Sequence, residues 1–304
     1  MQKSQAAGHP KLSKNQRVAA AREAARQAEE AAKLRQRRHS WLLRGGVVAA
    51  AIVVAVVIAL VVVNSLASNP PIADQGPAPA QANAYGGVVL GAEGVIVPPA
   101  TGAGTIDKST VAPQPNPLPT EMTDLPGIGI TPAAAGKPVP VVVYLDFICP
   151  FCKQFEGANG AYLKKLQEAG TITVEYRVVG VLDNMSTSLY SSRAAAAAAC
   201  VLDAAPQKYD AYFTALFAQQ PAEGSGGLSS DQLKTMARNA GVNVDSCIDN
   251  RTFRPWVQWA NAQARAHGIS LTPSVFVDGK QMPATSQDFQ AFAQPLIDAK
   301  AAAK

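Results

Sequence analysis

The amino-acid sequence predicts an α/β fold for residues 139–304, just over half of a chain of 304 residues. Three observations lead to this fold class. Two apolar, β-branched runs flank a helical segment, which is the pattern of a βαβ unit. A series of helical segments follows at about 186–268, and two short strands and a helix close the chain. The predicted order is therefore β-α-β, a helical insert, and β-β-α.

The first unit begins with "VPVVVYLDF" at 139–147, a nearly continuous apolar run that indicates a central strand buried on both faces. Residues 152–170 carry aromatic and Leu side chains at helical spacing, although Gly157 and Gly160 weaken the middle of this helix. "TITVEYRVVGVL" at 171–182 indicates the second strand. Together these segments form the βαβ unit.

The predicted insert contains four helical segments. An Ala-rich stretch spans 188–202, and aromatic side chains recur at helical spacing in 207–219. Residues 228–241 open with a Ser-Asp cap signal and close with Gly, and 246–268 supply one or two further helices.

After the insert, residues 273–282 indicate a strand, a turn at Asp278-Gly279 and a short return strand. Residues 286–304 form the closing helix, and Pro295 is expected to bend or interrupt it. These segments complete the ββα end of the predicted fold.

The basic character of the whole chain comes from its N-terminal tail. Residues 1–44 carry eleven Lys and Arg against three Glu, a net charge of +8, whereas the rest of the chain holds 16 basic and 19 acidic side chains, a net charge of −3. Contact with nucleic acid or anionic lipid is one interpretation of this tail. We favour a solvated helix that fixes membrane topology, and expect no nucleic-acid partner, because no aromatic residues are interleaved with the charges.

Nineteen uncharged residues, "GGVVAAAIVVAVVIALVVV" at 45–63, follow the tail. As a helix they span roughly 28 Å at ~1.5 Å per residue, which matches the hydrocarbon core of a bilayer. The preceding 44 residues are too long for the n-region of a cleaved signal. We therefore expect an uncleaved signal-anchor at 45–66, with cleavage after "SLA" as the alternative. The basic tail predicts a single-pass protein of the cell membrane, with a cytoplasmic N-terminus and an extracytoplasmic body.

Residues 67–138 are predicted to be an extracytoplasmic linker, because thirteen of the twenty-two prolines lie between residues 64 and 138. Two short apolar runs around a Gly-containing turn at 85–97 indicate a small hairpin within it. The linker would tether the compact domain 139–304 to the membrane.

The motif "CPFC" joins the first predicted strand to the following helix and carries the clearest chemistry of the sequence. At this junction the unpaired N–H groups and the dipole of the helix start stabilise a thiolate on Cys149. Pro150 suits the first helical position because it has no N–H to leave unpaired. We therefore predict Cys149 as an exposed nucleophile and Cys152, one turn further along, as the buried resolving thiol.

Two other functions of this pair are disfavoured. A zinc site needs four ligands, and the extracytoplasmic part adds only Cys200, Cys247 and His267, none at metal spacing, so we expect no metal. A structural Cys149–Cys152 disulfide closes too small a ring to constrain the unfolded chain much. Cys200 and Cys247, 47 residues apart, are instead predicted to form a structural disulfide that closes the insert. A second redox relay is the alternative for them.

Residues 139–304 resemble DsbA-family thiol:disulfide oxidoreductases, which have a thioredoxin fold with an inserted helical domain. The resemblance rests on "DFICPFCKQFE", "RAAAAAAC", "ALFAQQP" and "GISLTPSVFVDG", which are specific as a set. It implies a cis peptide bond at Thr272–Pro273 facing the cysteines, with the Thr272 backbone offering hydrogen bonds to an extended substrate. It also implies reoxidation by a membrane partner of DsbB or VKOR type, and no bound cofactor.

Two features depart from the family pattern. Phe151 stands where the best-known DsbA enzymes carry His, so we expect a less strongly lowered pKa at Cys149 and a less oxidising disulfide. Val143 stands where thioredoxin-like proteins often carry a buried acid. Asp146 and Glu156 are the nearby carboxylates that could instead manage the proton of the second cysteine, and ordinary solvated acids are the alternative interpretation.

The predicted function is the formation of disulfides in reduced exported proteins by a membrane-tethered oxidase. A reductase or isomerase of the same fold, for example one serving cytochrome c maturation, is the first alternative, because fold does not fix the direction of exchange. A cell-envelope binding or scaffold module with an incidental disulfide is the alternative of another class. The sequence leaves the direction, the substrates, the reoxidase and the oligomeric state open.

Overall fold

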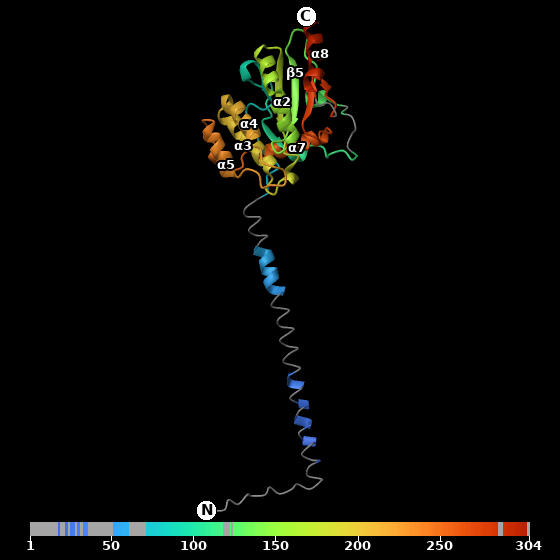
Figure 1. Ribbon diagram of the computed structural model, residues 1–304, viewed down its shortest axis with the longest axis vertical. Coiled ribbons are helices and arrows are strands. Elements are labelled where there is room, and N and C mark those ends of the chain that lie inside the picture. Colours follow the sequence, from blue (N-terminus) through green and yellow to red (C-terminus); the bar gives the residue numbers. More distant parts are fainter. Residues whose placement is uncertain are drawn as a thin grey trace, which may run out of the picture. The chain divides into compact units, whose positions relative to one another are not determined.

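In the computed structural model the chain divides into two compact units, Met1–Pro71 and Ile72–Lys304 (Figure 1). The structure describes residues 51–60, 71–117, 122, 124–284 and 288–302, together with some helical positions between 18 and 35.

The predicted signal-anchor 45–66 belongs to the first unit, and the structure describes residues 51–60 of it. Residues 51–60 are helical and exposed. Among the described residues, none of the helices combines the length and the apolar character needed to cross a membrane. The other residues of the 45–66 prediction, and most of the tail 1–44, lie outside the described residues.

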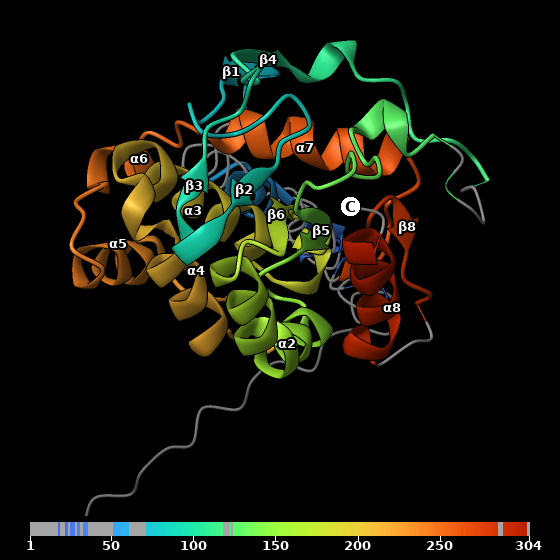
Figure 2. The same cartoon turned by 90° about the horizontal axis from the view of Figure 1, so that it is seen from above.

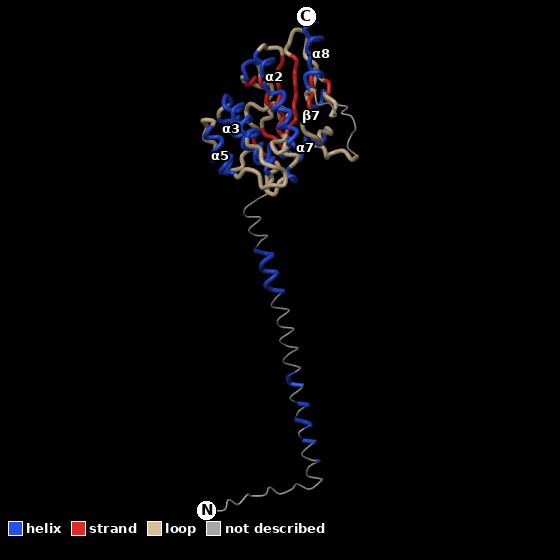
Figure 3. Tube along the Cα trace, in the orientation of Figure 1, coloured by secondary structure: helices blue, strands red, loops and turns tan. Residues whose placement is uncertain are grey.

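The second unit is built on a sheet with the strand order β3-β2-β6-β5-β7-β8 (Figure 3). Its strands are β2 (Val88–Leu90), β3 (Ile96–Val97), β5 (Val139–Leu145), β6 (Ile172–Val178), β7 (Ser274–Val277) and β8 (Lys280–Gln281). β5 pairs parallel with β6 and antiparallel with β7, and β2 pairs antiparallel with β6. A separate two-stranded sheet joins β1 (Gln75–Pro77) to β4 (Thr105–Asp107).

β5 is a central strand, as its apolar run predicts, because β-branched residues fill it and neighbours cover both of its faces. The predicted turn between β7 and β8 is also present. Asp278 and Gly279 both have positive φ, the backbone conformation that a two-residue hairpin turn requires.

The α-helices of this unit are α2 (Pro150–Glu168), α3 (Tyr190–Ala204), α4 (Tyr209–Ala218), α5 (Ser230–Asn239), α6 (Asp245–Asp249), α7 (Arg254–Ala266) and α8 (Phe289–Ala302). Short 3-10 turns are η1 (Ala92–Gly94), η2 (Lys108–Thr110), η3 (Pro126–Ile128), η4 (Asp183–Met185) and η5 (Pro206–Lys208). Helices α3 to α7 lie between β6 and β7, where the sequence predicts the insert. α8 continues through Pro295, so the expected interruption of the closing helix is not found.

Two layers of helices enclose the sheet. α2 and α8 lie on one side of it and α7 on the other (Figure 2). Val143 of β5 belongs to the same buried core as Phe155 of α2 and Phe289 of α8. The next residue towards the N-terminus, Val142, belongs to a second core with Ala264 of α7. Alternate residues of β5 therefore contribute to the two cores, as the period of a strand requires.

Part of the segment predicted as a linker, 67–138, is folded onto the α/β body, so the linker prediction is wrong for that part, whereas the small hairpin predicted at 85–97 is present. β2 and β3 form an antiparallel hairpin within 85–97 and extend the sheet through β6. β1 and β4 contact α7. A Pro-rich segment contributes few core residues on average. The short apolar run of β2 is nevertheless buried, because it pairs with the edge of β6.

Arg177 of β6 connects this N-terminal segment to the sheet. Its guanidinium is buried and donates to the carbonyl of Ile128 and the hydroxyl of Tyr144, both at 2.7 Å. Its Nε lies 2.6 Å from a carboxylate oxygen of Glu175, and the ring of Tyr85 lies over its guanidinium at 5.3 Å. Because a buried charge is tolerated only when it is paired, this cluster anchors the segments around residues 85 and 128 on β6.

Cys200 in α3 and Cys247 in α6 form a disulfide, with their Cα atoms 5.9 Å apart, which confirms the predicted pair. The six consecutive alanines at 194–199 are all buried. Their small side chains allow neighbouring helices to pack closely on α3. The disulfide therefore ties α6 to the centre of the insert.

Candidate active site

The CPFC motif lies where β5 ends and α2 begins. Cys149 is the N-cap residue of α2 and Pro150 is its first residue, as the sequence predicts. Cys149 and Cys152 are both free thiols. Cys149 is only 3% exposed, so the expectation of an exposed nucleophile is wrong. Phe151, between the two cysteines, is 66% exposed and forms the outer surface of the motif.

The Thr272–Pro273 peptide bond is cis, as the resemblance implies, and it lies beside the cysteines. The pairing of β5 with β7 explains this position. Tyr144 lies opposite Ser274, so the residues just before β7 reach the end of β5, where the CPFC turn starts. The Cys149 thiol donates to the carbonyl of Thr272, with 3.2 Å between sulfur and oxygen. Two segments 123 residues apart in the sequence thus meet at one sulfur atom.

The surroundings of Cys149 stabilise its thiolate. The hydrogen bond with the Cys152 thiol contributes most to lowering the pKa of Cys149 to about 6. Burial opposes this shift, while the Thr272 side chain and the backbone N–H groups of Cys152 and Phe151 add to it. The predicted helix-start effect is therefore present, but it is smaller than the effect of the second thiol. Burial, followed by the hydrogen bond with Cys149, raises the pKa of Cys152 well above its usual value. Near neutral pH the pair therefore holds one thiolate and one thiol.

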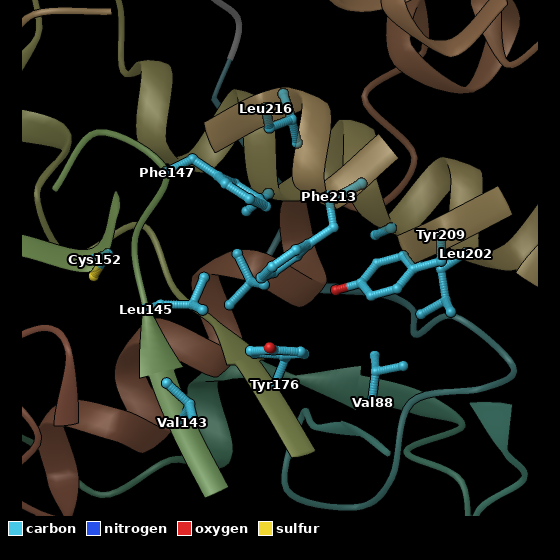
Figure 4. Close-up of a cluster of buried hydrophobic side chains, with 14 of the residues drawn as sticks. Val88, Val143, Leu145, Phe147, Cys152, Tyr176, Leu202, Tyr209, Phe213 and Leu216 are labelled. Atoms are coloured by element: carbon cyan, nitrogen blue, oxygen red, sulfur yellow. The ribbon is translucent and has the colours of Figure 1, made fainter. Parts of the chain in front are cut away.

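Gln220, in the loop after α4, holds the active-site turn, and the sequence alone gives it no role. Its Nε2 donates to the carbonyls of Cys149 and Phe147, at 2.9 Å and 3.0 Å. The ring of Phe147 packs on Phe213 and Phe217 of α4, with centroid distances of 5.5 Å and 5.1 Å, and Figure 4 shows it projecting toward Phe213. The insert therefore supports the turn through α4. The signal in the sequence is the motif "ALFAQQP", which contains this glutamine.

Asp146 is fully buried, so its interpretation as a solvated acid is wrong. Its carboxylate accepts hydrogen bonds from the backbone N–H groups of Ile148 and Leu182, both at 3.0 Å. Burial raises the pKa of Asp146 to about 7, although these hydrogen bonds oppose the shift. Its backbone carbonyl accepts from the N–H of Cys149 at 3.1 Å. Asp146 thus braces the turn that leads from β5 to the nucleophile.

Glu156 is half-buried, and it lines a different cavity from the one beside the cysteines. Its Oε2 accepts from the hydroxyl of Tyr176 at 3.2 Å. Burial raises the pKa of Glu156 to about 7; the Tyr176 hydrogen bond opposes the shift, and the negative charge of Asp210 adds to it. In the part of the chain that the structure describes, no hydrogen bond joins the carboxylate of Glu156 or of Asp146 to Cys152. A role of either acid in moving the Cys152 proton stays a hypothesis.

A pocket of about 380 Å³ opens beside the cysteines. Its lining comes from α2, from the loop around Thr272 and Pro273, and from the residues after β8. Phe151 and Leu271, 66% and 65% exposed, belong to this lining. Large exposed apolar side chains around a pocket mark a binding surface, and the arrangement fits an extended apolar polypeptide segment next to Cys149.

A CxxC pair at a strand-to-helix junction, facing a cis-proline loop in a βαβ and ββα scaffold, defines the class of thioredoxin-fold proteins. A family model described as thioredoxin matches residues 131–295, which is more than half of the chain. The chain therefore belongs to the thioredoxin family.

Similar solved structures are thiol-disulfide oxidoreductases. Reduced disulfide bond oxidoreductase DsbG from Mycobacterium tuberculosis is 31% identical, with 57% of this chain and 91% of that chain covered and a TM-score of 0.48. Oxidised DsbA from Mycobacterium tuberculosis is 32% identical, with 58% and 95% covered and a TM-score of 0.46. MdbA from Corynebacterium matruchotii is 28% identical, with 49% and 78% covered and a TM-score of 0.44. A comparison with curated proteins gives no match.

Proposed function

We propose that the chain is a thiol:disulfide oxidoreductase that forms disulfides in exported proteins, with Cys149 as nucleophile and Cys152 as resolving thiol. The observation that carries this proposal is the position of the Cys149 sulfur, which lies at the start of α2 and 3.2 Å from the backbone of the loop at Thr272. It brings a cysteine with a lowered pKa next to backbone groups with which an extended substrate can pair. A scaffold module with an incidental disulfide would need neither feature.

The reaction starts from the Cys149–Cys152 disulfide. A substrate thiolate attacks the Cys149 sulfur, and Cys152 leaves with the electron pair, which gives a mixed disulfide. A second substrate thiolate then attacks the substrate sulfur of this mixed disulfide, and Cys149 leaves as a thiolate. The substrate has lost two electrons and gained a disulfide, and the protein retains the two electrons as a dithiol. Stabilisation of the Cys149 thiolate makes it a good leaving group and favours this direction.

The neighbouring residues have supporting roles in this proposal. Pro150 starts α2 so that the helix N–H groups face the sulfur, and Phe151 and Pro273 line the pocket that receives the apolar part of a substrate. Thr272 offers its backbone to the substrate chain. No bound cofactor takes part in this exchange.

We infer that residues 45–66 anchor the protein in the cell membrane, with 1–44 in the cytoplasm and the catalytic domain outside. The apolar run of the sequence supports this, and so does the Cys200–Cys247 disulfide, because structural disulfides persist in oxidising compartments. Alkaline extraction of membranes should leave the full-length chain in the pellet, and protease added to intact spheroplasts should degrade the C-terminal domain. Release by alkali, or protection from the protease, would contradict this topology.

Continued turnover needs a reoxidant, for which we propose a membrane partner of DsbB or VKOR type. The second candidate function is a reductase or isomerase of the same fold. The observation that favours it is Phe151, which gives the Cys149 thiolate no cationic neighbour within the motif, so the disulfide is less oxidising than one with His at that position.

Measurement of the reduction potential, combined with a refolding assay, decides between these candidates. The oxidised full-length protein should convert a reduced, denatured model substrate to its native disulfide form, and its potential should lie above roughly −180 mV. A potential near the thioredoxin value of about −270 mV, with no oxidation of substrate, would point to the reductase. Faster rescue of a scrambled substrate than of a reduced one would point to the isomerase. Cys149→Ser is the inactive control.

A further inference from the structure

A second cavity, of about 470 Å³, lies on the face of α2 opposite the pocket beside the cysteines. Gly157 and Gly160 of α2, Phe213 and Phe217 of α4, and Tyr176 of β6 belong to its lining. A Cβ atom at Gly157 would meet no other atom within 4 Å. Open space therefore adjoins α2 at Gly157. Its volume is in the range of small-molecule sites.

Two carboxylates belong to the lining of the cavity, Glu156 from α2 and Asp210 from α4. Oε2 of Glu156 accepts a hydrogen bond from Tyr176, whereas Oε1 is buried and has no partner among the described residues. Neither acid takes part in an ion pair within the described part of the chain. A buried, unpaired carboxylate oxygen is unfavourable, so a ligand that donates to it gains free energy.

Aromatic rings form the rest of one wall. The centroids of Tyr176 and Phe213 are 4.5 Å apart, and those of Phe213 and Phe217 are 5.3 Å apart. Figure 4 shows the rings of Tyr176 and Phe213 next to one another. The faces of such rings attract cations as well as apolar groups. Carboxylates and aromatic faces thus select the same kind of ligand.

We propose that this cavity binds a small organic cation, a protonated amine on an apolar stem, with its ammonium group at Glu156 and Asp210 and its stem along the aromatic wall. The proposal is independent of the cysteine chemistry. Lys153 and Lys164 also line the cavity. Both are exposed, and neither forms an ion pair with Glu156 or Asp210 among the described residues. If these lysines governed binding, the cavity would instead prefer an anion.

The proposed site has a characteristic pH dependence. The titratable groups around Glu156 are Tyr176 on β6, Tyr209 and Asp210 on α4, and the cavity-lining Lys153 and Lys164 of its own helix. Burial raises the pKa of both tyrosines, so they stay neutral near pH 7, and burial raises the pKa of Glu156 to about 7. Only the ionised carboxylate pairs with an ammonium group. The affinity should therefore rise about tenfold between pH 6 and pH 8, following the ionised fraction of Glu156.

The test is calorimetric titration of the full-length protein in neutral detergent with phenethylammonium. Phenethyl alcohol is the neutral counterpart of this probe, phenylacetate is the anionic one, and empty micelles are the blank. The ammonium should bind about tenfold more tightly than the alcohol, as expected for a charge-assisted hydrogen bond. Glu156→Gln should reduce its affinity toward that of the alcohol and remove the pH dependence. Glu168→Gln, at an exposed position of the same helix, should change neither.

A second variant tests the location of the site. Gly157→Leu places a side chain in the open space and should abolish binding of both the ammonium and the alcohol. Equal binding of the alcohol and the ammonium, tighter binding of phenylacetate, or undiminished binding to Gly157→Leu would overturn the proposal. Cys149→Ser should bind the ammonium as tightly as wild type does. If the cavity does not bind the ammonium, the proposed redox function is unaffected.

Discussion

The side-chain amide of Gln220 donates to the carbonyl of Cys149 at 2.9 Å, and the same nitrogen donates to the carbonyl of Phe147 at 3.0 Å. These two carbonyls belong to the turn that ends at the nucleophile. The donor belongs to the helical insert, more than 70 residues further along the chain. The insert therefore has a direct part in setting the position of the Cys149 sulfur relative to the start of α2.

Gln220→Glu keeps the size of the side chain but replaces its donors with acceptors. We expect the pKa of Cys149 to rise, because the turn loses its support and gains a nearby negative charge. Stability should fall by about 1–3 kcal/mol, because two carbonyls lose their partner. Gln220→Met separates the two effects, since it removes the donors without adding charge. Thiolate absorbance as a function of pH is the measurement. Gln219→Glu, at an exposed position, is the control, and an unchanged titration in both Gln220 variants would refute the positioning role.

Phe151→His tests the effect of the residue between the cysteines. A protonated imidazole adjacent to Cys149 stabilises the thiolate, so the pKa of Cys149 should fall below about 6 and the disulfide should become more oxidising. Because Phe151 is 66% exposed, the exchange should leave the fold intact. Equilibration with glutathione buffers measures the potential. Phe151→Leu should keep the wild-type potential, and a His variant that does the same would contradict this account of the motif.

Glu156→Gln should change the dependence of stability on pH. The pKa of Glu156 is raised in the folded protein from its ordinary 4.5 to about 7, so the folded state binds this proton more tightly than the unfolded state does. Ionisation therefore destabilises the wild-type fold as pH rises through this range. The Gln variant should match wild type at pH 4 and exceed it by on the order of 2 kcal/mol at pH 8. Denaturant unfolding at both pH values measures this difference. Free energies of unfolding that differ by the same amount at pH 4 and pH 8 would contradict the raised pKa of Glu156.

Removal of the structural disulfide should destabilise the fold without removing the active site. The Cys200–Cys247 bridge spans 47 residues, and the chain-entropy model gives about 4 kcal/mol for a loop of that length. The double variant Cys200→Ala, Cys247→Ala should lose this amount in denaturant unfolding and keep the pKa of Cys149. A loss below about 1 kcal/mol would show that native packing alone holds α6 on α3.

The features that the sequence predicts correctly are those with a local pattern or a close chemical constraint. The apolar run at 139–147, the helix that follows Cys149 and the Asp278-Gly279 turn each carry their own signal. The Cys200–Cys247 pair follows from an even count of cysteines once the CPFC pair is set aside. The position of Thr272–Pro273 follows from the family resemblance.

Other features depend on tertiary contacts that no local pattern encodes. The burial of Cys149 results from the neighbouring loop at Thr272, and the role of Gln220 depends on where α4 ends. β2 joins the sheet because an edge of β6 is available, although its surroundings in the sequence are rich in proline. Glu156 follows Cys152 by one helical turn but lines the cavity on the α4 side, which only the packing of α4 against α2 decides.

The central claim is that the fold makes Cys149 a thiolate near neutral pH while Cys152 stays protonated. Its most direct test is the rate of iodoacetamide alkylation of the reduced full-length protein as a function of pH, with the modified cysteine identified by mass spectrometry. The account predicts modification of Cys149 with a midpoint at about pH 6, and no modification of Cys152 in that range. A midpoint near the ordinary cysteine value of about 8.5, or equal modification of both cysteines, would contradict it.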